Sequence, residues 1–200
     1  MKKILLMVTV AMMTAMNVNA QRNGYDTKHE IGISYGAMSN TTWMSIGDAM
    51  GTILTLGAVK YSDGKFIGPI AVEYFYHLNP IIGIGAIGAY AKETKDILLA
   101  NEYYGEAKNT YITVMPAAKF NWLRKKYFGM YSKVAVGMTF VSLKEDYSVS
   151  NVENHSESRV AFNFQASALG IEAGSENIRA FAELGIGEQG VILGGVRAKF

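Results

Sequence analysis

Hydrophobic and polar residues alternate with a period of two along most of the chain after Thr27. This period indicates β-strands, because successive side chains of a strand point to opposite sides of a sheet. Seven stretches have one apolar and one polar face. An eighth, 81–91, carries Ile and Gly on both faces, so its register stays open. In chain order the stretches begin near Ile31, Phe66, Ile81, Ile112, Phe128, Val160, Ala180 and Ile192. The pattern predicts an all-β chain with eight strands.

The connections between these strands alternate in length. The long ones are 37–65, 92–109 and 143–158, and the short ones between them are 77–80, 121–126 and 172–177. Short periplasmic turns and long extracellular loops are usual in outer-membrane barrels. The last connection, 187–190, departs from this alternation because it is short on the long-loop side. A sheet spans a bilayer only when it is closed, since lipid offers no hydrogen bonds to an edge. We therefore expect a closed, antiparallel, up-and-down transmembrane β-barrel.

The first twenty residues have the pattern of a secretory signal peptide. Lys2 and Lys3 form a basic start, 4–16 are mainly apolar, and Val18-Asn-Ala20 has the small residues of a cleavage site. The apolar run is shorter than the ~20 residues that a membrane-spanning helix needs. We expect a signal peptide over 1–20, cleaved after Ala20, and an outer-membrane barrel domain over 21–200.

Composition narrows the function classes further. The chain has 19 Lys and Arg against 17 Asp and Glu, and Lys2 and Lys3 account for the whole difference. The mature chain is formally neutral, which gives no indication of nucleic-acid binding. The absence of cysteine excludes a disulfide scaffold and a thiolate metal site.

The last strand is amphipathic and ends on an aromatic residue at the carboxyl terminus. One face carries Ile192, Gly194, Val196, Ala198 and Phe200, and the other carries Arg197 and Lys199. A secreted, lipocalin-like barrel would turn the apolar face inward, whereas a membrane barrel turns it outward. Periodicity alone does not choose between them. The signal peptide, the alternating loop lengths and the terminal Phe favour the membrane.

Several of these features together resemble a known family. The signal peptide, the eight stretches, Phe181-Ala-Glu-Leu-Gly-Ile-Gly and Gly194-Gly-Val-Arg-Ala-Lys-Phe200 are similar to small outer-membrane β-barrel proteins of the OmpA/OmpX and opacity types. The resemblance implies a location in the bacterial outer membrane, with membrane lipid as a partner. It also implies that Phe200 is part of the signal read by the barrel-assembly machinery. The family shares no catalytic residues, so none are transferred.

The polar faces of the strands predict a filled lumen. An eight-stranded barrel is only wide enough for side chains, and charges enclosed in it must pair. We expect Glu73 and Glu183 to form an ion-pair network with Lys133, Arg159 and Arg197. The further expected lumen residues are Glu30, Tyr111, Lys119, Asn163, Gln165, Arg179 and Lys199.

The long first loop, 38–64, is open to more than one interpretation. Trp43, Ile46, Met50 and Leu54 recur at helical spacing, which predicts a short helix. Alternatively, 52–61 extends the second strand upward, or forms a hairpin around Ser62-Asp-Gly64. The hairpin would raise the strand count toward ten.

These observations predict a barrel with a structural or adhesive role, contacting an extracellular ligand through its outer loops. The alternative is a narrow, porin-like solute channel. Less favoured are an outer-membrane barrel enzyme and a secreted, lipocalin-like binding barrel. The three histidines are scattered, and no residue is nominated as catalytic, cofactor-binding or metal-binding. We expect a protein that is not an enzyme and needs no cofactor.

Overall fold

The computed structural model describes residues 27–40, 59–61, 65–99, 102–147 and 155–200. The expected signal peptide and the helical pattern around Trp43 lie outside these residues. The strands are β1 (His29–Ala37), β2 (Val59–Tyr61), β3 (Lys65–His77), β4 (Ile82–Leu99), β5 (Glu102–Arg124), β6 (Phe128–Tyr147), β7 (His155–Gly174), β8 (Ile178–Gly187) and β9 (Ile192–Lys199).

The described strands form a closed, antiparallel barrel. Each of the long strands pairs with its neighbours along the chain, and β1 closes the ring by pairing with β9 on one side and β3 on the other. The ring contains eight strands, because β2 pairs only with the outer end of β4. The predicted fold class and the count of eight are confirmed for the described part of the chain.

The short strand β2 resolves one of the alternatives for the first loop. Tyr61 pairs with Ile97, and Lys65 at the start of β3 pairs with Thr94 on the same edge of β4. Residues 59–61 therefore continue the line of β3 upward, and they do not form a separate hairpin with it. Residues 62–64, where the tight turn was expected, lie outside the described residues.

Burial is inverted relative to a water-soluble protein. Arg197 is 1% exposed inside the barrel, whereas Phe162 on the outer wall is 69% exposed. The same contrast holds around the ring, because the period of two sends alternate side chains to the two sides of the wall. Exposed outer residues include Tyr35, Val72, Tyr74, Ile84, Ile112, Val136, Met138, Phe140, Val160, Leu184, Ile186 and Val196.

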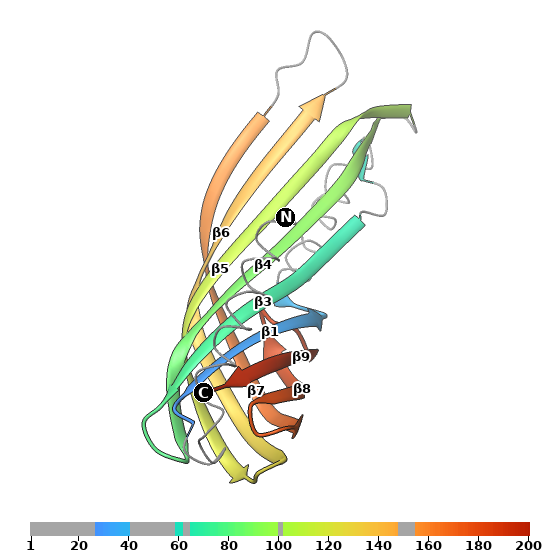
Figure 1. Ribbon diagram of the computed structural model, residues 1–200. Coiled ribbons are helices and arrows are strands. Elements are labelled where there is room, and N and C mark those ends of the chain that lie inside the picture. Colours follow the sequence, from blue (N-terminus) through green and yellow to red (C-terminus); the bar gives the residue numbers. More distant parts are fainter. Residues whose placement is uncertain (1–26, 41–58, 62–64, 100–101, 148–154) are drawn as a thin grey trace.

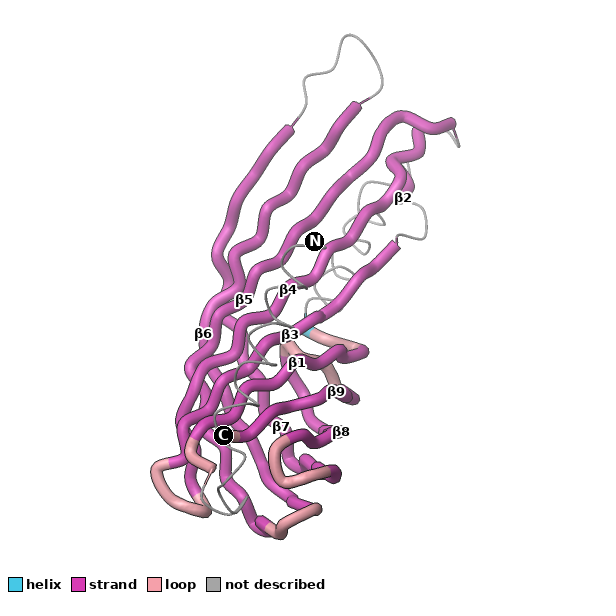
Figure 2. The backbone as a smooth tube through the Cα atoms, viewed as in Figure 1, coloured by secondary structure: helices cyan, strands magenta, loops and turns pink. Residues whose placement is uncertain are grey.

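Four strands extend well beyond the rest of the barrel. Figures 1 and 2 show β4, β5, β6 and β7 rising past the ends of β8 and β9. We call residues 91–99, 102–111, 141–147 and 155–159 the projecting sheet. Its inner face is held by contacts among Ala91, Tyr111 and Val141, against which Phe66 and Leu143 pack.

The projecting sheet corrects the prediction of two long outer loops. Pairing continues up to Leu99 with Glu102 and up to Glu145 with His155. The expected loops 92–109 and 143–158 are therefore largely strand. The sequence pattern changes there because the outer face becomes polar while the inner face carries apolar residues such as Ala91, Tyr111 and Val141, the reverse of the arrangement lower in the barrel.

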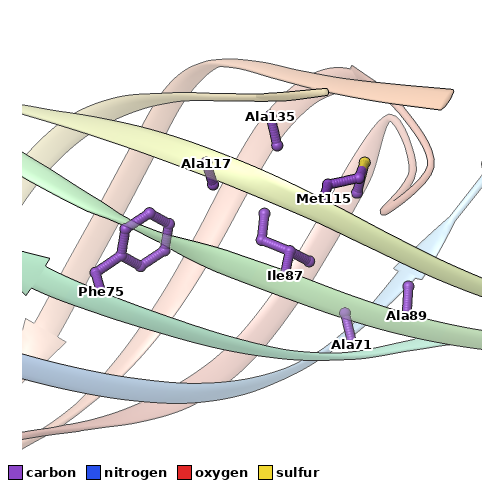
Figure 3. Packing of buried hydrophobic residues seen from close by; sticks show 7 residues of the cluster. All are labelled: Ala71, Phe75, Ile87, Ala89, Met115, Ala117 and Ala135. Atoms are coloured by element: carbon purple, nitrogen blue, oxygen red, sulfur yellow. The ribbon is translucent and has the colours of Figure 1, made fainter. Parts of the chain in front are cut away.

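One part of the barrel interior is apolar. Ala71 and Phe75 of β3, Ile87 and Ala89 of β4, Met115 and Ala117 of β5 and Ala135 of β6 form a buried cluster. Figure 3 shows these side chains gathered on the inner side of the adjoining strands. Most of them are small, which leaves room for the long charged side chains that reach across from the opposite wall.

The seam between β1 and β9 tolerates no added side chain at Gly36. A Cβ there would lie 1.6 Å from the carbonyl oxygen of Gln189, in the turn between β8 and β9. At Gly88 an added Cβ would meet nothing within 4 Å. We predict that Gly36→Ala lowers the free energy of unfolding by about 1–3 kcal/mol through overpacking, measured by urea unfolding in detergent micelles. Gly88→Ala is the matched control and should change it by less than about 0.5 kcal/mol. Equal effects at the two glycines would contradict the closed seam.

Candidate functional site

The barrel interior holds a dense group of charged side chains. Among the described strand residues, four carboxylates and five cations, each at most 2% exposed, lie on its inner wall. The carboxylates are Glu30, Glu73, Glu172 and Glu183, and the cations are Lys119, Lys133, Arg179, Arg197 and Lys199. Isolated buried charges would cost several kcal/mol each, so such a group is stable only if its members pair.

Arg197 of β9 is the hub of this group. Its Nη2 lies 2.7 Å from Oε1 of Glu73, and its Nη1 lies 2.9 Å from Oε2 of Glu172. Nη1 is also 3.2 Å from Oε1 of Glu30. Nη2 donates a further hydrogen bond of 2.7 Å to the Tyr131 hydroxyl. The planar guanidinium has donors in several directions, which lets one side chain join carboxylates from β1, β3 and β7.

Lys133 of β6 forms a second bridge, between β3 and β8. Its Nζ is 2.8 Å from Glu73 and 2.9 Å from Glu183. Glu183 also accepts hydrogen bonds of 2.6 Å from the hydroxyls of Tyr131 and Ser167. The carboxylate oxygens are thus satisfied by a cation and by neutral donors together.

Glu172 of β7 gathers cations at the turn end of the barrel. Arg179 donates to it at 2.6 Å, Lys199 contacts it, and Lys119 lies 3.7 Å away. Arg179 also donates to the backbone carbonyls of the β5–β6 turn. This carboxylate therefore ties the last strand and one turn to the inner wall.

Glu30 of β1 completes the network beside the β3–β4 turn. It accepts a hydrogen bond of 2.6 Å from Lys119, and His77 lies 3.2 Å from its second oxygen. The Lys119 ammonium also lies 4.0 Å from the centre of the Tyr131 ring. Cation–π contact gives this cation a further favourable neighbour in a site without bulk water.

The turn between β8 and β9 lies over the other end of the network. Glu188 and Gln189 in this turn are each 1% exposed. Glu188 accepts hydrogen bonds from Thr113 at 3.1 Å and from Asn163 at 2.7 Å. The backbone N–H of Gln189 donates to Gln165 at 2.8 Å. Inward side chains and a folded-in turn thus contact each other inside the barrel.

The structure brings together four of the five residues that were expected to form the network. Glu73, Lys133, Glu183 and Arg197 are in direct contact. The expectation for Arg159 is wrong, because its side chain is exposed on the projecting part of β7. Glu183 pairs in register with Gly170, eleven residues further along β7, which is roughly 36 Å at 3.3 Å per residue.

Sequence reasoning missed Glu172 and Tyr131. Glu172 was assigned to a turn, although the alternation Ile171, Glu172, Ala173 continues the strand pattern and was a usable signal. Tyr131 is 0% exposed and points inward beside Gly170, where an added Cβ would lie 2.4 Å from its ring. The alternation that turns Lys133 inward also turns Tyr131 inward and was a usable signal, whereas the packing of its ring against Gly170 on the neighbouring strand has no local signature.

The terminal residue Phe200 lies at the seam of the barrel. Its backbone exchanges hydrogen bonds of 2.8 and 2.9 Å with His29, and the two rings stack with centroids 5.4 Å apart. His29 also forms a 2.8 Å hydrogen bond with the Tyr74 hydroxyl. The last residue is thus an ordered part of the wall.

The described segments contain no group of three or more His, Asp or Glu side chains arranged to hold a metal ion. They also contain no apolar helix long enough to cross a bilayer.

Comparisons with known proteins return similar structures only. No family model and no curated protein matches the chain. Among solved structures, it is similar to a crystal structure of Ail, the attachment invasion locus protein of Yersinia pestis, with 16% identity and a TM-score of 0.42 over 87% of this chain and 97% of that chain. A crystal structure of Ail with the heparin analogue sucrose octasulfate gives 15% identity and a TM-score of 0.43 over the same shares.

Because Arg197 contacts several buried carboxylates, we expect removal of its charge to lower the free energy of unfolding strongly. Arg197→Met leaves Glu30, Glu73 and Glu172 short of a cation in a closed interior, so we expect a loss of about 3–5 kcal/mol in the free energy of unfolding. Arg159→Met removes the same charge from an exposed position and should cost less than about 0.5 kcal/mol. Urea unfolding in detergent micelles, followed by tryptophan fluorescence, measures both. A similar loss in the two variants would refute the hub role.

Proposed function

We propose that this chain is an integral outer-membrane barrel with a closed lumen that contacts partners outside the cell through its projecting sheet. The observation that carries the proposal is the inverted burial, with charged residues inside and large apolar residues outside. An outer wall of this kind matches the hydrocarbon of a bilayer and is unfavourable in water. The lipid around the barrel is its first partner.

The packed interior argues against the channel alternative. Glu73, Glu183, Lys133 and Arg197 meet at ion-pair distance in the middle of the barrel, and each is at most 1% exposed. Opening a path for a solute would separate these charges, at a cost of several kcal/mol for each uncompensated ion. A structural role for these charges is sufficient to account for their geometry, and a pore function is not needed to explain it. We likewise expect no enzymatic activity.

The projecting sheet supplies the contact surface. Along 155–163, β7 pairs with β6, and its other edge has no partner strand among the described residues. Free N–H and C=O groups on such an edge accept an added strand from another chain. The proposed contact surface, which was expected on long outer loops, would lie on an ordered sheet, and this lowers the entropy cost of binding.

Phe200 is proposed to serve assembly. It stacks on His29 at the seam that closes last in chain order, between the first and the last strand. Recognition of this strand by the barrel-assembly machinery would couple export to closure of the barrel.

A shortened variant tests the contact function. Removing 95–107 and 144–157 deletes the outer part of the projecting sheet and leaves the charged network intact. Bacteria displaying the full chain should adhere to cultured epithelial cells or immobilised matrix proteins, and the shortened variant should lose most of this adhesion. Outer-membrane fractionation and heat-modifiable migration on a denaturing gel control for folding. Undiminished adhesion by a folded, shortened barrel would rule out the projecting sheet as the contact surface.

A further inference from the structure

The outer faces of β4, β5 and β6 carry the same residue types toward their projecting ends, although on β4 the lysine precedes the hydroxyl residue. Each passes from a large apolar residue through hydroxyl and lysine positions to an acid. On β4 the order is Tyr90, Lys92, Thr94, Asp96; on β5 it is Ile112, Thr110, Lys108, Glu106; on β6 it is Phe140, Ser142, Lys144, Asp146. On β3, Ile67 is followed by Lys65 in the same direction.

Strand register places equivalent residues side by side. Tyr90 pairs with Ile112, and Ile112 pairs with Phe140, which makes one apolar row. Two rows further out, Lys65 pairs with Thr94, Thr94 with Lys108, and Lys108 with Lys144. The outermost row consists of Asp96, Glu106 and Asp146. Neighbouring strands are ~4.8 Å apart, so these rows are continuous layers of apolar, basic and acidic side chains.

The basic layer is only partly neutralised by the protein itself. Lys108 bonds to Glu106 at 2.7 Å and to Asp146 at 3.1 Å, and these hydrogen bonds raise its pKa above the ordinary value. No carboxylate whose side-chain placement the structure describes lies within 4.0 Å of the ammonium groups of Lys65, Lys92 or Lys144. Within the part of the chain that the structure describes, three of these four lysines thus have no carboxylate partner just beyond the apolar wall.

We propose that Lys65, Lys92 and Lys144 bind the phosphate groups of anionic lipid in the leaflet that surrounds the projecting end of the barrel. The inference rests on the proposed membrane function, which puts the apolar wall in hydrocarbon. Lysines just beyond that wall meet the headgroup layer, where they attract phosphate, and acids are placed further away from it. In a protein surrounded only by water, the environment would be the same along the whole strand and would not favour this order of charges.

The layers also explain why the acids stand side by side. Like charges directly opposite each other on neighbouring strands are destabilising. Lys108 relieves the contact between Glu106 and Asp146, and the distance from the membrane surface removes their repulsion with lipid phosphate. The arrangement sets the depth of the barrel, because movement in either direction would bring acids to the phosphates or lysines into hydrocarbon.

Lipid titration of the folded full chain in dodecyl maltoside micelles tests the proposal. The chain contains no cysteine, so a fluorophore on Ser142→Cys has one attachment site, in the row of Lys92 and Thr110 next to the row that holds Lys65, Lys108 and Lys144. The probes are diphosphorylated lipid A and the same lipid without its phosphates. We expect the phosphorylated form to bind about tenfold more tightly or better, and the difference to disappear in K65Q/K92Q/K144Q.

The control variant K28Q/K125Q/K126Q removes the same charge from the opposite rim and should keep the preference. The proposal is overturned if the wild type does not distinguish the two lipids, or if the K65Q/K92Q/K144Q variant still does. It is also overturned if soluble heparin binds as tightly and displaces the lipid, because the lysines would then serve a polyanion in solution. Heat-modifiable migration of the same samples reports on the barrel independently, so loss of lipid preference and failure of the membrane function are distinguishable.

Discussion

The structure depends on the mutual neutralisation of charges inside a closed wall. Among the described strand residues, four carboxylates and five cations share the enclosed interior, and Arg197 contacts all four carboxylates. The contacts of Arg197 with Glu73 and Glu172 join strands that are not neighbours in the sheet. They therefore hold the ring in one shape, in addition to the backbone ladder that holds each strand to the next.

This interior and the apolar exterior are two results of one sequence pattern. Because the period is two, an outward Val196 entails an inward Arg197, and every strand contributes to both surfaces. The pattern accordingly predicted the all-β class, the closed barrel, the eight strands and most of the inward residues. The pattern predicted well the parity of each residue, that is, whether it points into or out of the barrel, because this depends only on its neighbours in the chain. It did not predict how far along the barrel axis a residue lies, because this depends on the pairing between strands.

Two residues illustrate the difference. Arg159 has the parity of an inward residue, but pairing puts it opposite Val141, outside the enclosed part of the barrel. Glu172 was predicted in a turn, but pairing with Phe181 extends β7 past it and directs the carboxylate to Arg179 and Arg197. The projecting sheet was missed for a related reason. The outer face of the strands there is polar and apolar residues lie on the inner face, so the contrast on which the sequence prediction depended is reversed although the hydrogen-bonded ladder continues.

The central claim is that packed charges close the lumen of a membrane-spanning barrel, and single-channel recording in planar bilayers tests it most directly. The folded full chain is reconstituted, its insertion is verified by heat-modifiable migration of the recovered protein, and current is recorded alongside a general porin as positive control. The account predicts insertion with no discrete conductance steps for this chain. Reproducible steps from the inserted wild-type barrel would contradict it, because ions would then pass where Glu73, Lys133, Glu183 and Arg197 are in contact.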